Sequence, residues 1–189
     1  MPHAQAPPPG IYPPLVNFFH KDDSLDLESI KQHAVRTAKA GVTGLVILGS
    51  NGEAMHMDAQ ERVEVVSTIR KALDAEGLER FPLIVGCGQQ SKRATLSTIR
   101  DAKQAGGDYA LVLPPSYWPV AMTKPNVTKY FKELADESAL PILLYNFPLV
   151  ANGVTLDSDQ LIELSKHDNI VGCKLTCGVS PPNMLSGRS

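Results

Sequence analysis

The stretch GLVILGSNGE, Gly44 to Glu53, joins a short apolar run to a loop of glycine and polar residues. The run Gly44–Leu48 is almost continuously apolar, which is typical of a parallel strand that is covered on both faces. Four later runs have the same character: 82–85, 109–113, 141–145 and 170–174. The sequence therefore predicts a parallel β-sheet with one strand in each run.

A further strand is predicted before these runs, over residues 11–17 of GIYPPLVNFF. Two prolines count against it, because proline cannot donate a hydrogen bond to a sheet ladder. Amphipathic stretches between the predicted strands indicate helices. The predicted N-terminal caps are Asp26, Asp58 with Glu61, and Asp157 or Ser158, and Gly41 is predicted to end the first helix. The clearest buried stripe consists of Val127, Tyr130, Phe131, Leu134 and Ala135.

The predicted strands recur at a regular interval. They begin at residues 44, 82, 109, 141 and 170, so that 27 to 38 residues separate one start from the next. About 30 residues is the length of one βα unit. An α/β fold follows, and the interval fits both a (β/α) barrel and an open doubly wound sheet. Composition alone does not choose between the two.

The composition limits the partners of the chain. Its 189 residues are 43% hydrophobic, which is enough for one core, and its net charge is −2 with no run of basic residues. These properties give no reason to expect a nucleic-acid or membrane partner. No apolar run approaches the roughly 20 residues of a membrane span. The expected partner is a small soluble ligand.

The start of the chain and the cysteines bear on its compartment. MPHAQAPPPG, residues 1–10, has neither the apolar core of a signal peptide nor the arginines of a transit peptide, and is interpreted as a disordered leader. A cytoplasmic location is therefore expected. Cys87, Cys173 and Cys177 are an odd number at spacings that match no zinc pattern, so reduced, unpaired thiols are expected.

In both candidate architectures, chemistry gathers beyond the carboxyl ends of the strands. Lys174 closes the last predicted strand, where desolvation would favour a neutral amine that can form an imine with a ketone. Tyr145 ends the preceding strand and could move a proton beside that amine. The glycines of Gly49–Glu53 allow a tight turn whose N–H groups suit a carboxylate. Taken alone, each feature also fits a solvent-facing lysine, a half-buried ring or a plain turn.

The motifs GSNGE, YNFP and GCKLTCG stand in the order and roughly the separations of one known family. Over residues 10–178 the chain resembles the dihydrodipicolinate synthase and N-acetylneuraminate lyase family of class I, pyruvate-dependent aldolases. The resemblance implies a (β/α)8 TIM barrel. It also implies that Lys174 is the Schiff-base lysine and Tyr145 the catalytic tyrosine, which relays a proton as the carbon–carbon bond opens.

The resemblance further implies a substrate site and its ligand. The loop that carries Gly49, Ser50, Asn51 and Gly52 would hold the carboxylate of pyruvate. The reaction would need no metal and no organic cofactor. The keto acid would be the small-molecule partner, and the full-length protein would be a homo-oligomer.

Two departures from the family pattern narrow the substrate. Members that make dihydrodipicolinate carry an arginine shortly after the tyrosine motif, where this chain has Val150. In PPSYWP, Ser116 replaces one of a pair of tyrosines, and Tyr117 is kept as a candidate substrate-binding residue. Dihydrodipicolinate synthesis is thus the alternative to the main interpretation, an aldolase that cleaves 4-hydroxy-2-oxoglutarate or a 2-keto-3-deoxy sugar acid into pyruvate and an aldehyde.

The length of the chain raises a question of completeness. A full (β/α)8 barrel takes about 250 residues, whereas about six βα units are predicted here. We therefore expect a disordered leader over 1–10, a partial barrel over 11–178 and an aberrant, disordered tail over 179–189. Such a chain would have apolar sheet edges, so poor activity or insolubility is expected.

Three other interpretations compete with the aldolase. GCGQQS partly imitates a dinucleotide-binding loop, but Ser91 replaces the third glycine and Asp108 precedes its strand. A metal-dependent aldolase would need clustered ligands, whereas the five histidines are scattered. An inactive, shortened barrel could instead act as an interaction module that binds full-length subunits.

Overall fold

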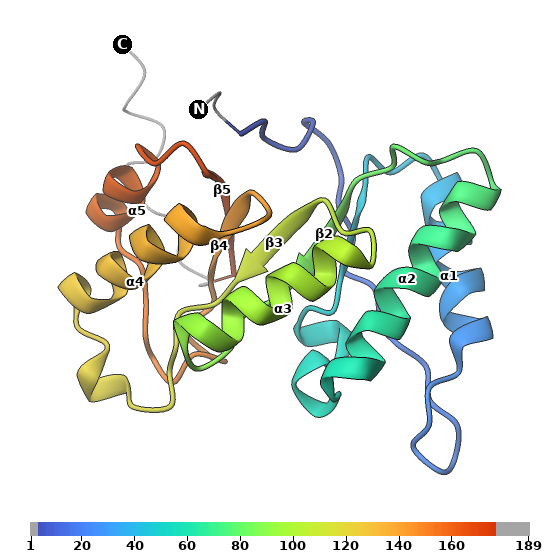
Figure 1. The fold of residues 1–189 in the computed structure, drawn as a ribbon, viewed down its shortest axis with the longest axis horizontal. Helices are drawn as coiled ribbons and strands as arrows, with labels where there is room; N and C mark the ends of the chain where they lie inside the picture. The colour runs from blue at the N-terminus through green and yellow to red at the C-terminus, as the bar shows by residue number, and fades with distance from the viewer. Residues whose placement is uncertain (1–3, 177–189) are drawn as a thin grey trace.

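The computed structural model describes residues 4–176, which form an α/β fold around one parallel sheet (Figure 1). Its strands are β1 (Leu45–Ile47), β2 (Leu83–Gly86), β3 (Tyr109–Val112), β4 (Ile142–Asn146) and β5 (Ile170–Leu175). They lie in the order β1-β2-β3-β4-β5, and every neighbouring pair is parallel. A doubly wound sheet reverses its strand order at a switch point, whereas a barrel adds strands in sequence. The strand order therefore favours the barrel.

Helices precede β1 and connect the later strands. The α-helices are α1 (Leu27–Lys39), α2 (Ala59–Ala75), α3 (Lys92–Gln104), α4 (Lys124–Glu137) and α5 (Ser158–Leu164), and the 3₁₀ helices are η1 (Ser50–Gly52), η2 (Ala54–His56) and η3 (Pro119–Ala121). The predicted N-caps are confirmed, with Asp26 at α1 and capping boxes begun by Asp58 at α2 and Asp157 at α5. Within residues 4–176, none of these helices has the length and apolar character that crossing a membrane requires.

The two faces of the sheet carry separate apolar clusters. The larger cluster packs the helices against the strands and contains fully buried side chains such as Phe131, Leu83 and Ile142. The smaller cluster lies on the other face and consists of Val46, Ile84, Leu111, Leu143 and Tyr145. Successive side chains of a strand point to opposite faces. In a barrel the smaller cluster faces the interior, so Tyr145 points inward from β4.

The predicted first strand over residues 11–17 is wrong as a strand. This segment runs beside β1 but forms only an isolated parallel bridge, between Pro14 and Val46. The Leu15 amide donates to the Val46 carbonyl at 2.9 Å, and the Val46 amide donates to Pro13 at 3.1 Å. Pro13 and Pro14 have no N–H group, so the ladder cannot extend. The described sheet therefore has five strands instead of the six expected.

The ends of the described chain bear on the predicted domain limits. Residues 4–10 belong to the predicted leader, and in this stretch the Ala4 amide donates to the Asp168 carbonyl at 3.2 Å. The Tyr12 hydroxyl donates to the Pro8 carbonyl at 2.6 Å. Cys177 and the predicted tail over 179–189 lie outside the described residues.

The larger apolar cluster gives a direct test of the fold. Phe131 on α4 is 0% exposed, so we expect Phe131→Ala to lower the free energy of unfolding by about 3–5 kcal/mol. Urea denaturation followed by circular dichroism measures the change. Lys129→Ala on the same helix is the control; this side chain is 75% exposed, and we expect a change within about 0.5 kcal/mol. Equal effects of the two substitutions would contradict the packing of α4.

Candidate active site

A cavity of about 210 Å³ lies at the carboxyl ends of the strands. Its walls come from the loops after β1, β2 and β3, and from Tyr145 at the end of β4. Glu53, His56 and Arg62 are its charged or titratable lining residues other than Tyr145, and the amides of Gln89 and Gln90 add polar groups. This is the edge at which a barrel collects its chemistry.

Lys174 and Tyr145 meet on neighbouring strands. They are register partners in the β4–β5 ladder, so their side chains leave the sheet on the same face. The Lys174 Nζ donates to the Tyr145 Oη at 3.4 Å and lies 4.4 Å from the centre of the Tyr145 ring. Tyr145 is 4% exposed and lines the cavity, whereas Lys174 is half-buried and is not among the lining residues. An amine and a phenol thus lie within reach of one small molecule.

The predicted carboxylate loop, Gly49–Glu53, contains the 3₁₀ helix η1. Two residues with a left-handed backbone conformation flank this helix. Leu48 has a φ of +53° and Glu53 a φ of +52°, which costs about 1–3 kcal/mol at a non-glycine residue. The amides of Gly52 and Glu53 are used by turn bonds to Gly49 and Ser50. The amides of Ser50 and Asn51 come before the first turn bond, as at the start of any helix. These two N–H groups are the ones available to a carboxylate.

The predicted loop residues divide between the cavity and the protein interior. Gly49 and Ser50 line the cavity, whereas Asn51 and Gly52 are not among its lining residues. Gly52 is buried, and its carbonyl accepts a hydrogen bond from the Asn17 Nδ2 at 2.6 Å. The irregular segment before α1 thereby holds the back of the loop.

The loop after β3 also reaches the cavity, but Tyr117 does not. Ser116 lines the cavity, whereas Tyr117 is 75% exposed and is not among the lining residues. Both backbone amides donate to the Gln90 Oε1, at 2.8 and 2.9 Å, so Gln90 fixes the direction of this loop. Val150, which stands where members that make dihydrodipicolinate carry an arginine, lines the cavity and presents an apolar surface to it.

Sequence reasoning missed two residues that shape the cavity. A Cβ atom on Gly86 would lie 1.8 Å from the Leu48 carbonyl oxygen, so only glycine allows the ends of β1 and β2 to approach so closely. Arg62 of α2 is 7% exposed and donates to two backbone carbonyls at this edge. A signal for Arg62 was available, because it continues the buried helical stripe of Val65, Val66 and Ile69 at a spacing of three to four residues.

Cys87 follows β2 but is buried away from the chemistry. The side chain is 0% exposed, and burial raises the pKa of its thiol to about 12. We expect alkylation of Cys87 by iodoacetamide at pH 8 to be at least about a hundredfold slower in the native chain than in urea, because the thiolate is the nucleophile. Peptide mass spectrometry measures the rate, and equal rates in both states would contradict the burial.

The same thiol makes stability depend on pH. Its pKa is higher in the folded chain than the ordinary value of about 8.5 in an unfolded chain. Its contribution to stability is therefore fully present below about pH 8.5 and is lost as the pH rises toward 12.

Comparison with known proteins assigns the class. The sequence matches the dihydrodipicolinate synthetase family over residues 7–184, and the chain belongs to this family. The family places the five strands within a (β/α)8 barrel, of which the described residues form a part. The open doubly wound alternative is thereby excluded.

Two curated relatives have names that specify an activity. The chain is 46% identical over 170 residues to a protein of Emericella nidulans named "Probable 4-hydroxy-2-oxoglutarate aldolase, mitochondrial", covering 90% of this chain and 55% of that protein. It is 46% identical over 172 residues to the L-threo-3-deoxy-hexylosonate aldolase of Hypocrea jecorina, with the same two coverages. The chain thus spans about half the length of the curated relatives that it matches.

Solved structures agree with the fold. A dihydrodipicolinate synthase family protein of Coccidioides immitis superposes with a TM-score of 0.83 at 42% identity, covering 92% of this chain and 54% of that protein. YagE of Escherichia coli K12, in complex with pyruvate, superposes with a TM-score of 0.78 at 35% identity, covering 87% and 53%.

Proposed function

We propose that this chain carries the imine-forming part of a class I, pyruvate-dependent aldolase site. The observation that supports the proposal most directly is the distance of 3.4 Å between the Lys174 amine and the hydroxyl of Tyr145, which lines the cavity. The complex of YagE with pyruvate supports pyruvate as the keto acid. Lys174 is the proposed nucleophile, and Tyr145 is the proposed proton carrier.

The proposed reaction follows from these two groups. The Lys174 amine adds to the keto carbon of the substrate, and Tyr145 gives its phenol proton to the hydroxyl group that leaves as water, so that a protonated imine and a phenolate result. The phenolate then takes the proton of the substrate hydroxyl as the carbon–carbon bond breaks, and the electron pair of that bond moves into the imine to leave an enamine. An aldehyde departs. The enamine takes up a proton, and water releases pyruvate and restores the amine.

The carboxylate loop is proposed to orient the keto acid. The N–H groups of Ser50 and Asn51 precede the first turn bond of η1, and Gly49 and Ser50 line the cavity. Hydrogen bonds from such N–H groups to a carboxylate are charge-assisted and therefore strong. A carboxylate bound there would fix the keto carbon relative to the amine, which is the positional part of catalysis.

The proposed substrate is 4-hydroxy-2-oxoglutarate or a 2-keto-3-deoxy sugar acid. The names of the relatives from Emericella nidulans and Hypocrea jecorina support these two choices. Dihydrodipicolinate synthesis is less well supported, because Val150 offers the cavity no positive charge for the carboxylate of a second substrate. Tyr117 stays a proposed substrate contact only if its exposed side chain moves toward the cavity.

Borohydride trapping tests the proposal. The purified chain is incubated with pyruvate and sodium borohydride, and the modified peptide is identified by mass spectrometry. We expect a reduced pyruvate adduct on Lys174. A folded chain that gives no adduct would contradict the proposal, and its co-purification with a full barrel subunit would then favour the interaction module.

Assembly and compartment are separate proposals. We propose a homo-oligomer for the full-length protein, which size-exclusion chromatography with light scattering would test. The cytoplasmic location expected from the sequence is also a proposal. The relative from Emericella nidulans carries the word mitochondrial in its name, so fractionation of the source cells must decide between the two compartments.

A further inference from the structure

Arg62 connects α2 to two loops of the candidate site. Its Nη1 donates to the Ala54 carbonyl at 2.8 Å, and its Nη2 donates to the Gly86 carbonyl at 2.5 Å. Ala54 directly follows the carboxylate loop, and Gly86 is the last residue of β2. One side chain therefore ties the end of the carboxylate loop to the end of the neighbouring strand.

The cost of burying Arg62 indicates that these contacts serve more than packing. The side chain is 7% exposed, and among the described residues no carboxylate forms an ion pair with it. Burial accordingly lowers the pKa of Arg62. Its Nε is buried and has no hydrogen-bond partner within residues 4–176. A well-packed apolar side chain often stabilises a fold as well as a buried charge does, so stability alone does not account for an arginine here.

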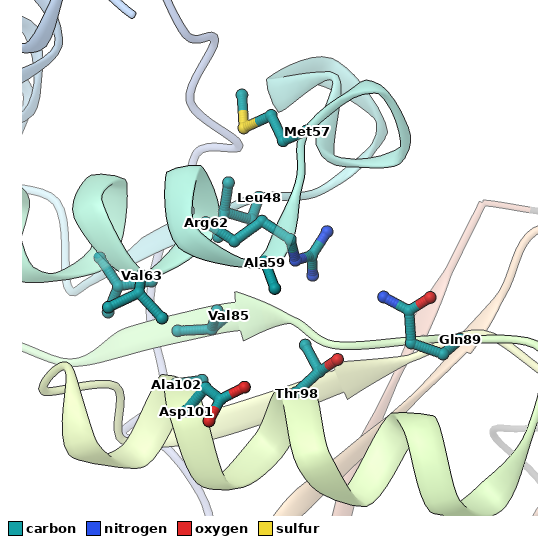
Figure 2. A pocket seen from close by; sticks show the side chains of 11 residues that line it. Leu48, Met57, Ala59, Arg62, Val63, Val85, Gln89, Thr98, Asp101 and Ala102 are labelled. Carbon is teal, nitrogen blue, oxygen red and sulfur yellow. The ribbon is translucent and has the colours of Figure 1, made fainter.

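A second cavity lies next to Arg62. This cavity has a volume of about 250 Å³ and is lined by residues of α2 and α3 and by the ends of β1 and β2 (Figure 2). Leu48, Arg62 and Gln89 line both this cavity and the candidate site. Leu48, which directly precedes the carboxylate loop, borders this space, so removal of the guanidinium would leave more room beside the start of the loop.

We infer that Arg62 is a positioning residue that holds the carboxylate loop at a fixed distance from the Lys174 amine. The inference rests on the proposed function and deepens it. Within residues 4–176, Arg62 forms no hydrogen bond with Tyr145 on β4 or with Lys174 on β5, which are hydrogen-bonded to each other. Its loss should therefore weaken the capture of the keto acid and leave the chemistry of the amine nearly unchanged.

The same helix supplies a matched control. Arg70, eight residues after Arg62 on α2, has a side chain that is 12% exposed. It donates to the carbonyls of Gly106 at 3.0 Å, Glu79 at 3.1 Å and Phe81 at 2.9 Å. Glu79 and Phe81 precede β2, and Gly106 precedes β3, so Arg70 ties loops at the opposite end of the sheet. The two arginines differ in which end of the strands they fasten.

The experiment compares Arg62→Met, Arg62→Lys and Arg70→Met in borohydride trapping over a range of pyruvate concentrations. For Arg62→Met we expect the half-saturating pyruvate concentration to rise about 10- to 100-fold, as a misplacement near 1 Å would produce, with the rate at saturation within about threefold. Arg62→Lys keeps one donor nitrogen, so its half-saturating pyruvate concentration should rise less. Arg70→Met should lower stability without moving the half-saturating concentration.

Hydrogen–deuterium exchange gives a second measurement that needs no pyruvate. We expect Arg62→Met to speed exchange of the Gly52 and His56 amides, which donate to the Gly49 and Glu53 carbonyls, by at least about tenfold, and Arg70→Met to leave this exchange unchanged. Equal exchange in the two methionine variants would overturn the inference. A wild-type chain without an adduct would instead refute the proposed function, while the exchange result would still decide whether Arg62 holds the loop.

Two trapping outcomes would also overturn the positioning role. One is a lower rate at saturation with an unchanged half-saturating concentration, which would place Arg62 in the chemistry itself. The other is an equal rise in Arg62→Met and Arg70→Met, which would show only general loosening of the fold. If Arg62→Met does not fold, Arg62→Lys carries both measurements, and a wild-type result for it in both would contradict the inference.

Discussion

Replacing Lys174 by arginine is expected to abolish the pyruvate adduct, with a fall of at least about a thousandfold in the trapping rate. Arginine has a side chain of similar length that still carries N–H donors. Its guanidinium does not lose its proton in proteins, so it cannot attack a keto carbon. Half-burial of the side chain on β5 gives no reason to expect unfolding. Mass spectrometry of the borohydride-treated variant measures the loss.

Lys132→Arg is the control for this substitution. The Lys132 amine lies on α4, is 45% exposed and pairs with Glu163 at 2.6 Å. Lys132→Arg should leave trapping unchanged, because Lys132 is not among the residues that line the cavity. An adduct that persists in Lys174→Arg on another lysine would move the proposed nucleophile to that residue.

The sheet could be predicted because buried parallel strands leave a strong local pattern. GLVIL and PILLY are almost continuously apolar, and β1 and β4 are found within them. The prediction failed at residues 11–17, where the apolar pattern continues but Pro13 and Pro14 remove the donors of a ladder. Hydrophobicity indicated which face would be buried, and only the backbone hydrogen bonds decided whether a strand formed.

The candidate site could be predicted where it depends on strand register. In a parallel sheet, residues that close neighbouring strands lie side by side, and Tyr145 and Lys174 are such a pair. The roles of Arg62 and Gly86 could not be predicted in this way. They depend on a side chain of α2 and a carbonyl at the end of β2, which are 24 residues apart in the chain. Contacts with backbone carbonyls leave no residue pattern, because every residue has a carbonyl group.

Replacing Tyr145 by phenylalanine is expected to lower the rate of pyruvate trapping by about 10²–10⁴-fold, the usual contribution of a general acid or base. The substitution removes the hydroxyl that lies 3.4 Å from the Lys174 Nζ. It keeps the buried ring, which packs against Phe147 at 5.7 Å between centroids and lies 4.4 Å from the same Nζ. The amine therefore stays in place and loses only its proton partner. Quenched trapping at saturating pyruvate measures the rate.

Tyr130→Phe is the control that separates chemistry from stability. The Tyr130 hydroxyl is buried on α4, shares a hydrogen bond of 2.9 Å with Thr95, and has its pKa raised to about 12 by burial. Removing it should cost about 1 kcal/mol of unfolding free energy and leave trapping unchanged. For Tyr145→Phe we expect the reverse, because within residues 4–176 the Tyr145 hydroxyl is hydrogen-bonded to Lys174 alone. The same atom is removed in both variants, so a stability loss without a rate loss at Tyr145 would show that its phenol is structural and that the proton carrier must be sought elsewhere in the cavity.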